Sequence, residues 1–169
     1  MDVGTYVEVD GRPAVQFVCT FDHPVRRVWS AVTDAAELGR WFPSSVEIDL
    51  RDGGTVSFSG DPHLESSTGR VLDVEPPHHL AFTWGADELR FDLAPDGRSC
   101  QLTLTDILDE QNTAARNAAG WAVCLGELAR HLAGQDCEGP HSAANAARFQ
   151  PLYKAHIASG VPFGADIPD

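Results

Sequence analysis

Apolar and polar residues alternate over much of the chain, a pattern typical of β-strands that bury one face. From about residue 46 to 108 the period is two, and clusters of Gly, Pro and Asp divide this stretch into short segments. The chain from about residue 5 to 21 is also strand-like, and the turn signal Asp10-Gly11 makes it either a hairpin or one long bent strand. The pattern predicts a curved antiparallel sheet of about six to seven strands with one large apolar face.

Three further segments carry helical spacing. Residues 25–32 and 34–42 form two short helices after the first strand, and Asp34 with Glu37 is typical of a capping box at the start of the second. After residue 113 a helix of about 20 residues follows, and Gly134 ends it. Its apolar stripe consists of Ala114, Ala118, Trp121, Leu125, Leu128 and Leu132.

The chain is expected to form one domain over residues 1–134, on which a linker, a short helix and a tail over residues 135–169 pack. The short helix is predicted over about residues 148–157, with Pro151 in its first turn or kinking it. The outer face of the long helix carries a small apolar strip, formed by Ala119, Val123 and Gly126. We expect the tail helix to cover this strip, and a homodimer in which a second subunit covers it is the alternative.

Charge and composition exclude several classes of protein. The 12 Lys and Arg residues against 25 Asp and Glu residues give an acidic chain with a formal net charge of −13, which argues against nucleic acid as a partner. The chain has neither the pattern of a signal peptide nor a long apolar run, so we expect no membrane insertion and a cytoplasmic location.

Cysteine and histidine spacing predicts neither a metal site nor a cofactor. The four cysteines contain no C-x-x-C pair, so we interpret them as reduced thiols. His78-His79 has no third ligand nearby in the sequence and lies in a Pro-Pro turn, where solvent exposure is expected.

Four blocks of residues stand out by their order and spacing. They are Pro24-x-x-x-Val28-Trp29-x-x-Val32-Thr33-Asp34, Leu38-x-x-Trp41-Phe42, Gly69-x-Val71-x-x-Val74-x-Pro76-Pro77-x-x-Leu80-x-Phe82-x-Trp84 and Gly120-Trp121-x-x-x-Leu125-x-x-Leu128. Together they resemble the SRPBCC superfamily, which has the START-like or helix-grip fold. Within it they are similar to the group named for the activator of the heat-shock-protein-90 ATPase, over about residues 17–132. The resemblance implies an α+β fold in which a curved sheet wraps around the long helix, with a cavity between them for apolar small molecules, polyketides or lipids.

Large apolar residues of the sheet and the long helix are the candidate lining of that cavity. Alternate positions of a strand point to the same face of the sheet, so these side chains can converge on the space between the sheet and the helix. There they either line a ligand pocket or fill the core. Small residues on the helix stripe favour unfilled volume. The candidate pocket residues are Trp41, Phe42, Phe58, Phe82, Trp84, Phe91, Leu102, Leu104, Trp121, Leu125 and Leu128.

Asp106 is the one candidate for catalysis, because it shares the parity of Leu102 and Leu104. It faces inward unless the strand ends there, in which case its carboxylate is solvated. Relatives often have a histidine at this position, so no role of that histidine carries over. No nucleophile elbow, catalytic triad or phosphate loop is present. The sequence thus predicts non-catalytic or weakly catalytic binding of an apolar or amphipathic small molecule. The alternatives are a cyclase-like enzyme on a polyketide or aromatic substrate, and a co-chaperone-type interaction module.

Overall fold

Eight antiparallel strands form a single curved sheet in the computed structural model, which describes residues 3–168. Their spatial order is β1-β2-β8-β7-β6-β5-β4-β3, so every neighbour in the sheet except the β2–β8 pair is also a neighbour along the chain. The strands are β1 (Thr5–Val9), β2 (Arg12–Phe21), β3 (Ser45–Ile48), β4 (Thr55–Ser59), β5 (Ser67–Glu75), β6 (His79–Trp84), β7 (Asp87–Asp96) and β8 (Ser99–Ile107). The predicted strand-like start is a hairpin of two strands, so the sheet has eight strands where about six to seven were expected.

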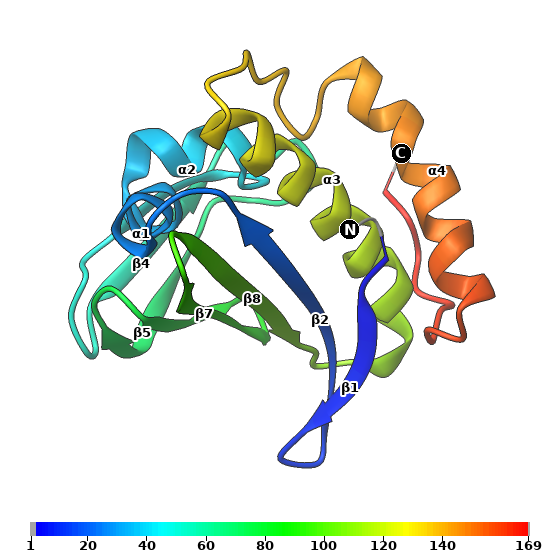
Figure 1. Ribbon diagram of the computed structural model, residues 1–169. Coiled ribbons are helices and arrows are strands. Elements are labelled where there is room, and N and C mark those ends of the chain that lie inside the picture. The colour runs from blue at the N-terminus through cyan, green and yellow to red at the C-terminus, as the bar shows by residue number, and fades with distance from the viewer. Residues whose placement is uncertain (1–2, 169) are drawn as a thin grey trace.

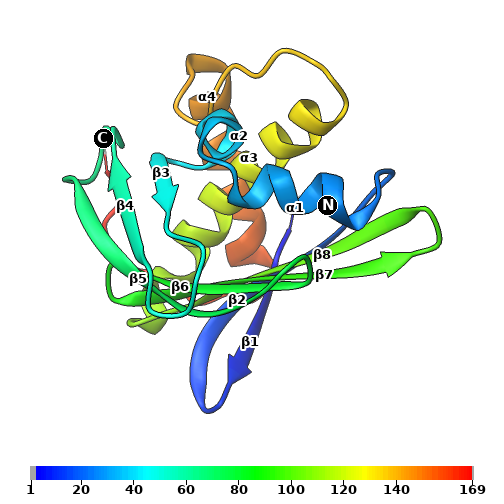
Figure 2. The same ribbon diagram turned by 90° about the vertical axis from the view of Figure 1, so that its left-hand side faces the viewer.

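Four α-helices lie on one side of the sheet, with the long helix α3 between the sheet and α4 (Figures 1 and 2). The Asp34 side chain accepts hydrogen bonds from the backbone N–H groups of Ala36 and Glu37 at 3.0 and 3.2 Å, which confirms the predicted N-cap. Gly134, with a φ of +74°, ends α3 as expected. The helices are α1 (Val25–Thr33), α2 (Ala35–Trp41), α3 (Ala114–Leu132) and α4 (Ala143–Ala158), and a 3₁₀ turn, η1 (Gln111–Thr113), precedes α3.

Helix α4 begins earlier than the sequence indicated. The Ser142 hydroxyl caps it by accepting from the backbone N–H of Asn145 at 3.2 Å, so Pro151 lies in the interior of the helix and not in its first turn. The first turns of α4 contain mostly alanine, so large apolar side chains mark the helix only from Phe149 onward. This is why periodicity alone placed its start about five residues too late.

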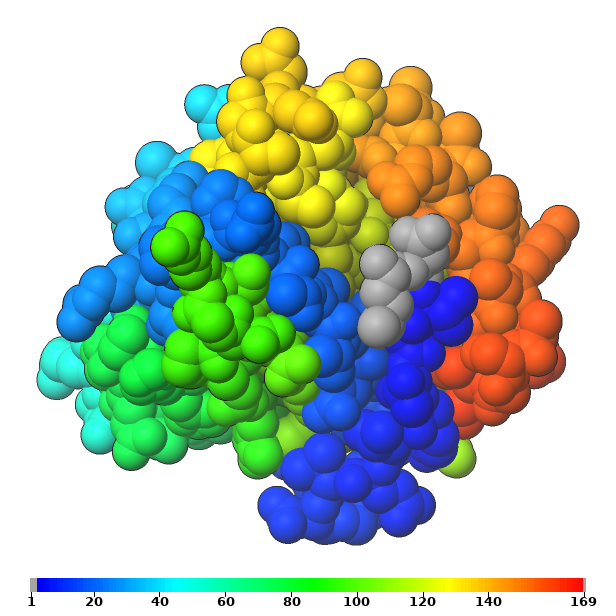
Figure 3. Space-filling view, in the orientation of Figure 1, coloured from blue at the N-terminus to red at the C-terminus, as the bar shows by residue number. Residues whose placement is uncertain are grey.

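Helix α4 packs against α3 within the same chain, over the small apolar strip. Gly126 lies under Arg148, since a Cβ added at Gly126 would be 3.1 Å from the Arg148 Nη1 atom. The His156 ring is fully buried: its Nε2 accepts from the Gly4 backbone N–H at 2.8 Å, and its Nδ1 lies 2.8 Å from the Leu152 carbonyl oxygen. These contacts fix α4 to both α3 and the N-terminal strand, and Figure 3 shows the N-terminal hairpin beside the C-terminal part of the chain.

None of the helices in the described residues is long and apolar enough to cross a membrane. All four cysteines are unpaired thiols, and burial raises the pKa of the Cys124 thiol.

Candidate functional site

Rings fill the space between the sheet and α3. Phe42, which is only 2% exposed, lies at the centre of this cluster and contacts five other aromatic rings at centroid distances of 5.5–6.5 Å. Ten of the eleven candidate pocket residues belong to this packed core and are at most 5% exposed. One of the ten, Trp121, also lines the cleft described below, and the other nine do not. These nine are Trp41, Phe42, Phe58, Phe82, Phe91, Leu102, Leu104, Leu125 and Leu128.

An open cleft of about 1000 Å³ lies at the other side of α3. Its walls are α3, the first half of α4, the β4–β5 loop, the β6–β7 turn and the C-terminal segment, and its lining is mainly apolar. Two of the candidate pocket residues, Trp84 and Trp121, line it. The other large apolar side chains in its lining are Leu64, Val123, Phe149 and Ile167.

The two tryptophans form one aromatic wall. Their ring centroids are 5.2 Å apart at an interplanar angle of 56°. Trp84 ends β6, and Trp121 lies in the middle of α3. Gly120 lines the cleft beside Trp121, and a Cβ added there would meet no atom within 4 Å. The missing side chain at Gly120 therefore leaves part of the cleft open.

Carboxyl and amide groups form the polar end of the cleft. The Asp106 Oδ2 atom accepts from the Trp121 indole Nε1–H at 3.0 Å and from the Asn117 Nδ2–H at 3.2 Å. The same Asn117 amide donates to Asp87 Oδ2 at 3.3 Å, and Asp87 Oδ1 accepts from the Asp109 backbone N–H at 3.0 Å. Asn117 thus bridges the two carboxyl groups of Asp87 and Asp106.

Asp106 is completely buried, so the expectation of a solvated carboxylate at a strand end is wrong. Strand β8 continues through Ile107, which places Asp106 under α3. Burial raises the pKa of Asp106 well above its ordinary value, and the nearby Asp87 carboxylate raises it further. The Asp106 Oδ1 atom is buried and has no hydrogen-bond partner among the described residues.

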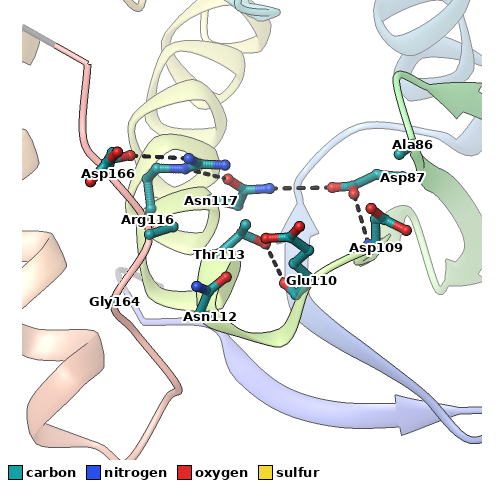
Figure 4. A pocket seen from close by; sticks show the side chains of 11 residues that line it. Ala86, Asp87, Asp109, Glu110, Asn112, Thr113, Arg116, Asn117, Gly164 and Asp166 are labelled. Carbon is teal, nitrogen blue, oxygen red and sulfur yellow. Dashed lines mark hydrogen bonds between the residues drawn. The ribbon is translucent and has the colours of Figure 1, made fainter.

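A second, polar depression of about 500 Å³ adjoins the cleft at Asp87 and Asn117 (Figure 4). Arg116 contributes the cationic side chain of its lining, and its guanidinium donates to the Asn117 Oδ1 atom at 3.1 Å and to the Asp166 backbone oxygen at 3.0 Å. Asp109 and Glu110 add carboxylates to the same depression. Negative charge therefore predominates at this end of the cleft.

Raising the pH is expected to destabilise the protein through Asp106. Because the fold raises the pKa of Asp106, its contribution to stability is complete below the pKa of an unfolded Asp and falls as the pH rises toward the folded pKa, by up to about 1.4 kcal/mol per pH unit. In Asp106→Asn the amide oxygen still accepts from Trp121 and Asn117, and nothing ionises.

Urea denaturation of both proteins from about pH 5 to about pH 8 measures this effect. The free energy of unfolding of Asp106→Asn minus that of the wild type should increase with pH, while the same difference for the exposed Asp96→Asn should stay flat. A difference for Asp106→Asn that does not change with pH contradicts a raised pKa of Asp106 in the folded protein.

Sequence reasoning missed several residues of the cleft. Asp87 was interpreted only as part of a turn, although its register opposite Trp84 in the β6–β7 hairpin brings it to the aromatic wall. Asn117 lies one helical turn before Trp121, a spacing that places both side chains on one face of α3. The β4–β5 loop and the C-terminal segment carry no local pattern that indicates a binding wall.

A curved antiparallel sheet wrapped around a long C-terminal helix defines a helix-grip protein, here with a cleft outside the filled core. The model of the family described as "Activator of Hsp90 ATPase homolog 1-like protein" matches residues 22–133, and this chain belongs to that family. The match spans β3 to β8 and α1 to α3 but not β1, β2, α4 or the C-terminal segment.

Solved structures with the same fold include three that are informative. CalU16 from Micromonospora echinospora is 23% identical, with a TM-score of 0.71 over 92% of this chain and 94% of that chain. The BPP1335 protein from Bordetella parapertussis is 26% identical, with a TM-score of 0.67 over 89% of each chain. DynU16, from the dynemicin biosynthetic locus, is 26% identical, with a TM-score of 0.62 over 72% of this chain and 48% of that chain. No curated protein matches the sequence significantly.

Proposed function

We propose that this protein binds an apolar or amphipathic small molecule in the cleft between α3, α4, the β4–β5 loop and the β6–β7 turn, without catalysis or with weak catalysis only. The observation that carries the proposal is the cleft of about 1000 Å³ with a mainly apolar lining and two adjacent tryptophan rings. Ligand sites in proteins are typically concave, apolar and aromatic, with a few polar groups at one end. The polar end here is the group formed by Asp87, Asn117 and Asp106.

The site of binding differs from the one that the fold alone implies. The space between the sheet and α3 is occupied by aromatic rings that are nearly unexposed, so it offers little volume to a ligand. The cleft on the α4 side is accessible to ligands. The origin of the similar DynU16 in a biosynthetic locus supports a small molecule as the ligand.

An enzyme of the cyclase type is the second candidate, because Asp106, whose pKa is raised by burial, lies next to the cleft. Its side chain is completely buried, however, so that Asp87 and Asn117 lie between it and a bound molecule. This arrangement supports binding over direct proton transfer to a ligand. A co-chaperone role, which the family's name suggests, and a cytoplasmic location stay predictions.

Filling the cleft at Gly120 tests the proposed function. Gly120→Leu places a side chain in open space that belongs to the cleft, and Gly39→Leu, at an exposed position in α2 with equally open surroundings, is the matched control. Both substitutions should raise the free energy of unfolding by up to about 1 kcal/mol, because Gly disfavours helix.

The probe is the neutral aromatic dye N-phenyl-1-naphthylamine, followed by its fluorescence. The wild type and Gly39→Leu should bind it saturably, and Gly120→Leu should bind at least about tenfold more weakly although it is no less stable. Equal binding by Gly120→Leu, or no saturable binding by the wild type, would overturn the proposed function.

A further inference from the structure

We propose that the molecule bound in the cleft carries a cationic nitrogen, an alkylammonium group, that lies against the Trp84 and Trp121 rings beside the Asp87 carboxylate. The inference rests on the proposed function, since it names the chemical class of ligand for the same cleft.

The first support is the aromatic wall. Trp84 and Trp121 are inclined to one another at 56° with their centroids 5.2 Å apart, and both line the cleft. Indole is the aromatic ring that attracts cations best through its quadrupole, and ammonium groups are commonly recognised by pairs or cages of such rings. Two adjacent indoles beside the carboxyl groups of the cleft favour a cation at that end.

The second support is negative charge without a cationic partner. In residues 3–168, neither Asp87 nor Asp106 forms an ion pair with Lys, Arg or His. Arg116 is the nearest cationic side chain in the lining, and its guanidinium donates to an amide oxygen and a backbone oxygen instead of a carboxylate. The Asp106 carboxyl, completely buried, has one oxygen without an N–H donor. A cationic group in the cleft would therefore meet carboxyl groups that no described Lys, Arg or His side chain pairs with.

The third support is that charge and rings are held in a fixed relation. Asp87 is the residue opposite Trp84 across the β6–β7 hairpin, and Asn117 and Trp121 are one turn apart on α3. The Asn117 amide and the Trp121 indole N–H both donate to Asp106, which ties the hairpin pair to the helix pair. An alkylammonium group meets a preorganised site there, while its apolar part extends toward Leu64 and Phe149.

Three probes of similar size and different charge test the inference by calorimetry near pH 7. They are 2-phenylethylamine, 2-phenylethanol and 3-phenylpropionate, which are cationic, neutral and anionic. The wild type should bind the amine about tenfold more tightly than the alcohol, and the anion most weakly. The order of the three affinities is measured on the wild type alone, so it tests the inference even if a substitution impairs folding.

Asp87→Asn assigns the preference to this site. It should reduce the ratio of amine to alcohol affinity to below about threefold. Asp96→Asn removes an exposed carboxylate from the same strand and controls for the general attraction of an acidic protein for cations; its ratio should equal that of the wild type. If the alcohol binds the wild type as tightly as the amine, the inference is wrong and the proposed function stands. If no probe binds, the inference is overturned, and the titration with N-phenyl-1-naphthylamine decides the proposed function separately.

Discussion

Replacing Phe42 by Ala is expected to lower the free energy of unfolding by about 3–5 kcal/mol, as measured by urea denaturation. The reason is its position: the ring is 2% exposed and contacts Trp41, Phe58, Phe82, Trp84 and Trp121. Its removal leaves a void among rigid rings that cannot all move to fill it.

The control for Phe42→Ala is Phe163→Ala, because Phe163 is 57% exposed and its loss should change stability by less than about 0.5 kcal/mol. A loss below about 1 kcal/mol for Phe42→Ala would mean that the space between the sheet and α3 is loosely filled. The ligand cavity would then be the space between the sheet and α3, as the sequence indicated. The cleft on the α4 side would not be the binding site.

Ending the chain after Gly134 should lower the free energy of unfolding by about 3 kcal/mol or more, or cause the protein to associate. The truncation removes α4, whose Leu152 and His156 side chains are buried, and with it the hydrogen bond that holds Gly4. It also uncovers the strip on α3 that includes Gly126. Each buried apolar side chain that is lost removes about 1.5–3 kcal/mol before the entropy of ordering is subtracted.

Thermal unfolding and size-exclusion chromatography of the truncated and full chains make this measurement. Lys154→Ala, at an exposed position of α4, should behave as the wild type and shows that a change in the helix surface alone has no effect. A truncated protein that is monomeric and as stable as the full chain would show that α4 is not part of the folded unit.

Much of the fold is predictable because each element has a local cause. Alternation along β7 and β8 identifies strands, the Asp34 side chain caps a helix, and Gly134 ends one. These features depend on a few neighbouring residues. The resemblance in the four blocks of residues then gives the order in which the elements pack, and the family match confirms it.

The position of the open space could not be predicted in the same way. Parity shows that Phe82 and Phe91 point to the concave face, but whether rings fill the space there depends on how their volumes fit together. The same limit applies to Asp106, whose burial depends on where β8 ends and on α3 lying above it. The cleft itself is formed by parts of five segments far apart in the sequence, so no local sequence pattern predicts it.

The central claim is that ligands enter the cleft at Trp84 and Trp121 and leave the aromatic core undisturbed. The chain has four tryptophans, and each gives one indole N–H signal in a ¹H–¹⁵N NMR spectrum. The Trp121 indole donates to Asp106 at the cleft, and the Trp41 indole donates to the Ala31 carbonyl oxygen at 2.9 Å inside the core. Titration with N-phenyl-1-naphthylamine should shift the Trp84 and Trp121 signals saturably and leave those of Trp41 and Trp29 in place. Shifts of the Trp41 signal without those of Trp84 and Trp121 would contradict the claim and assign binding to the space between the sheet and α3.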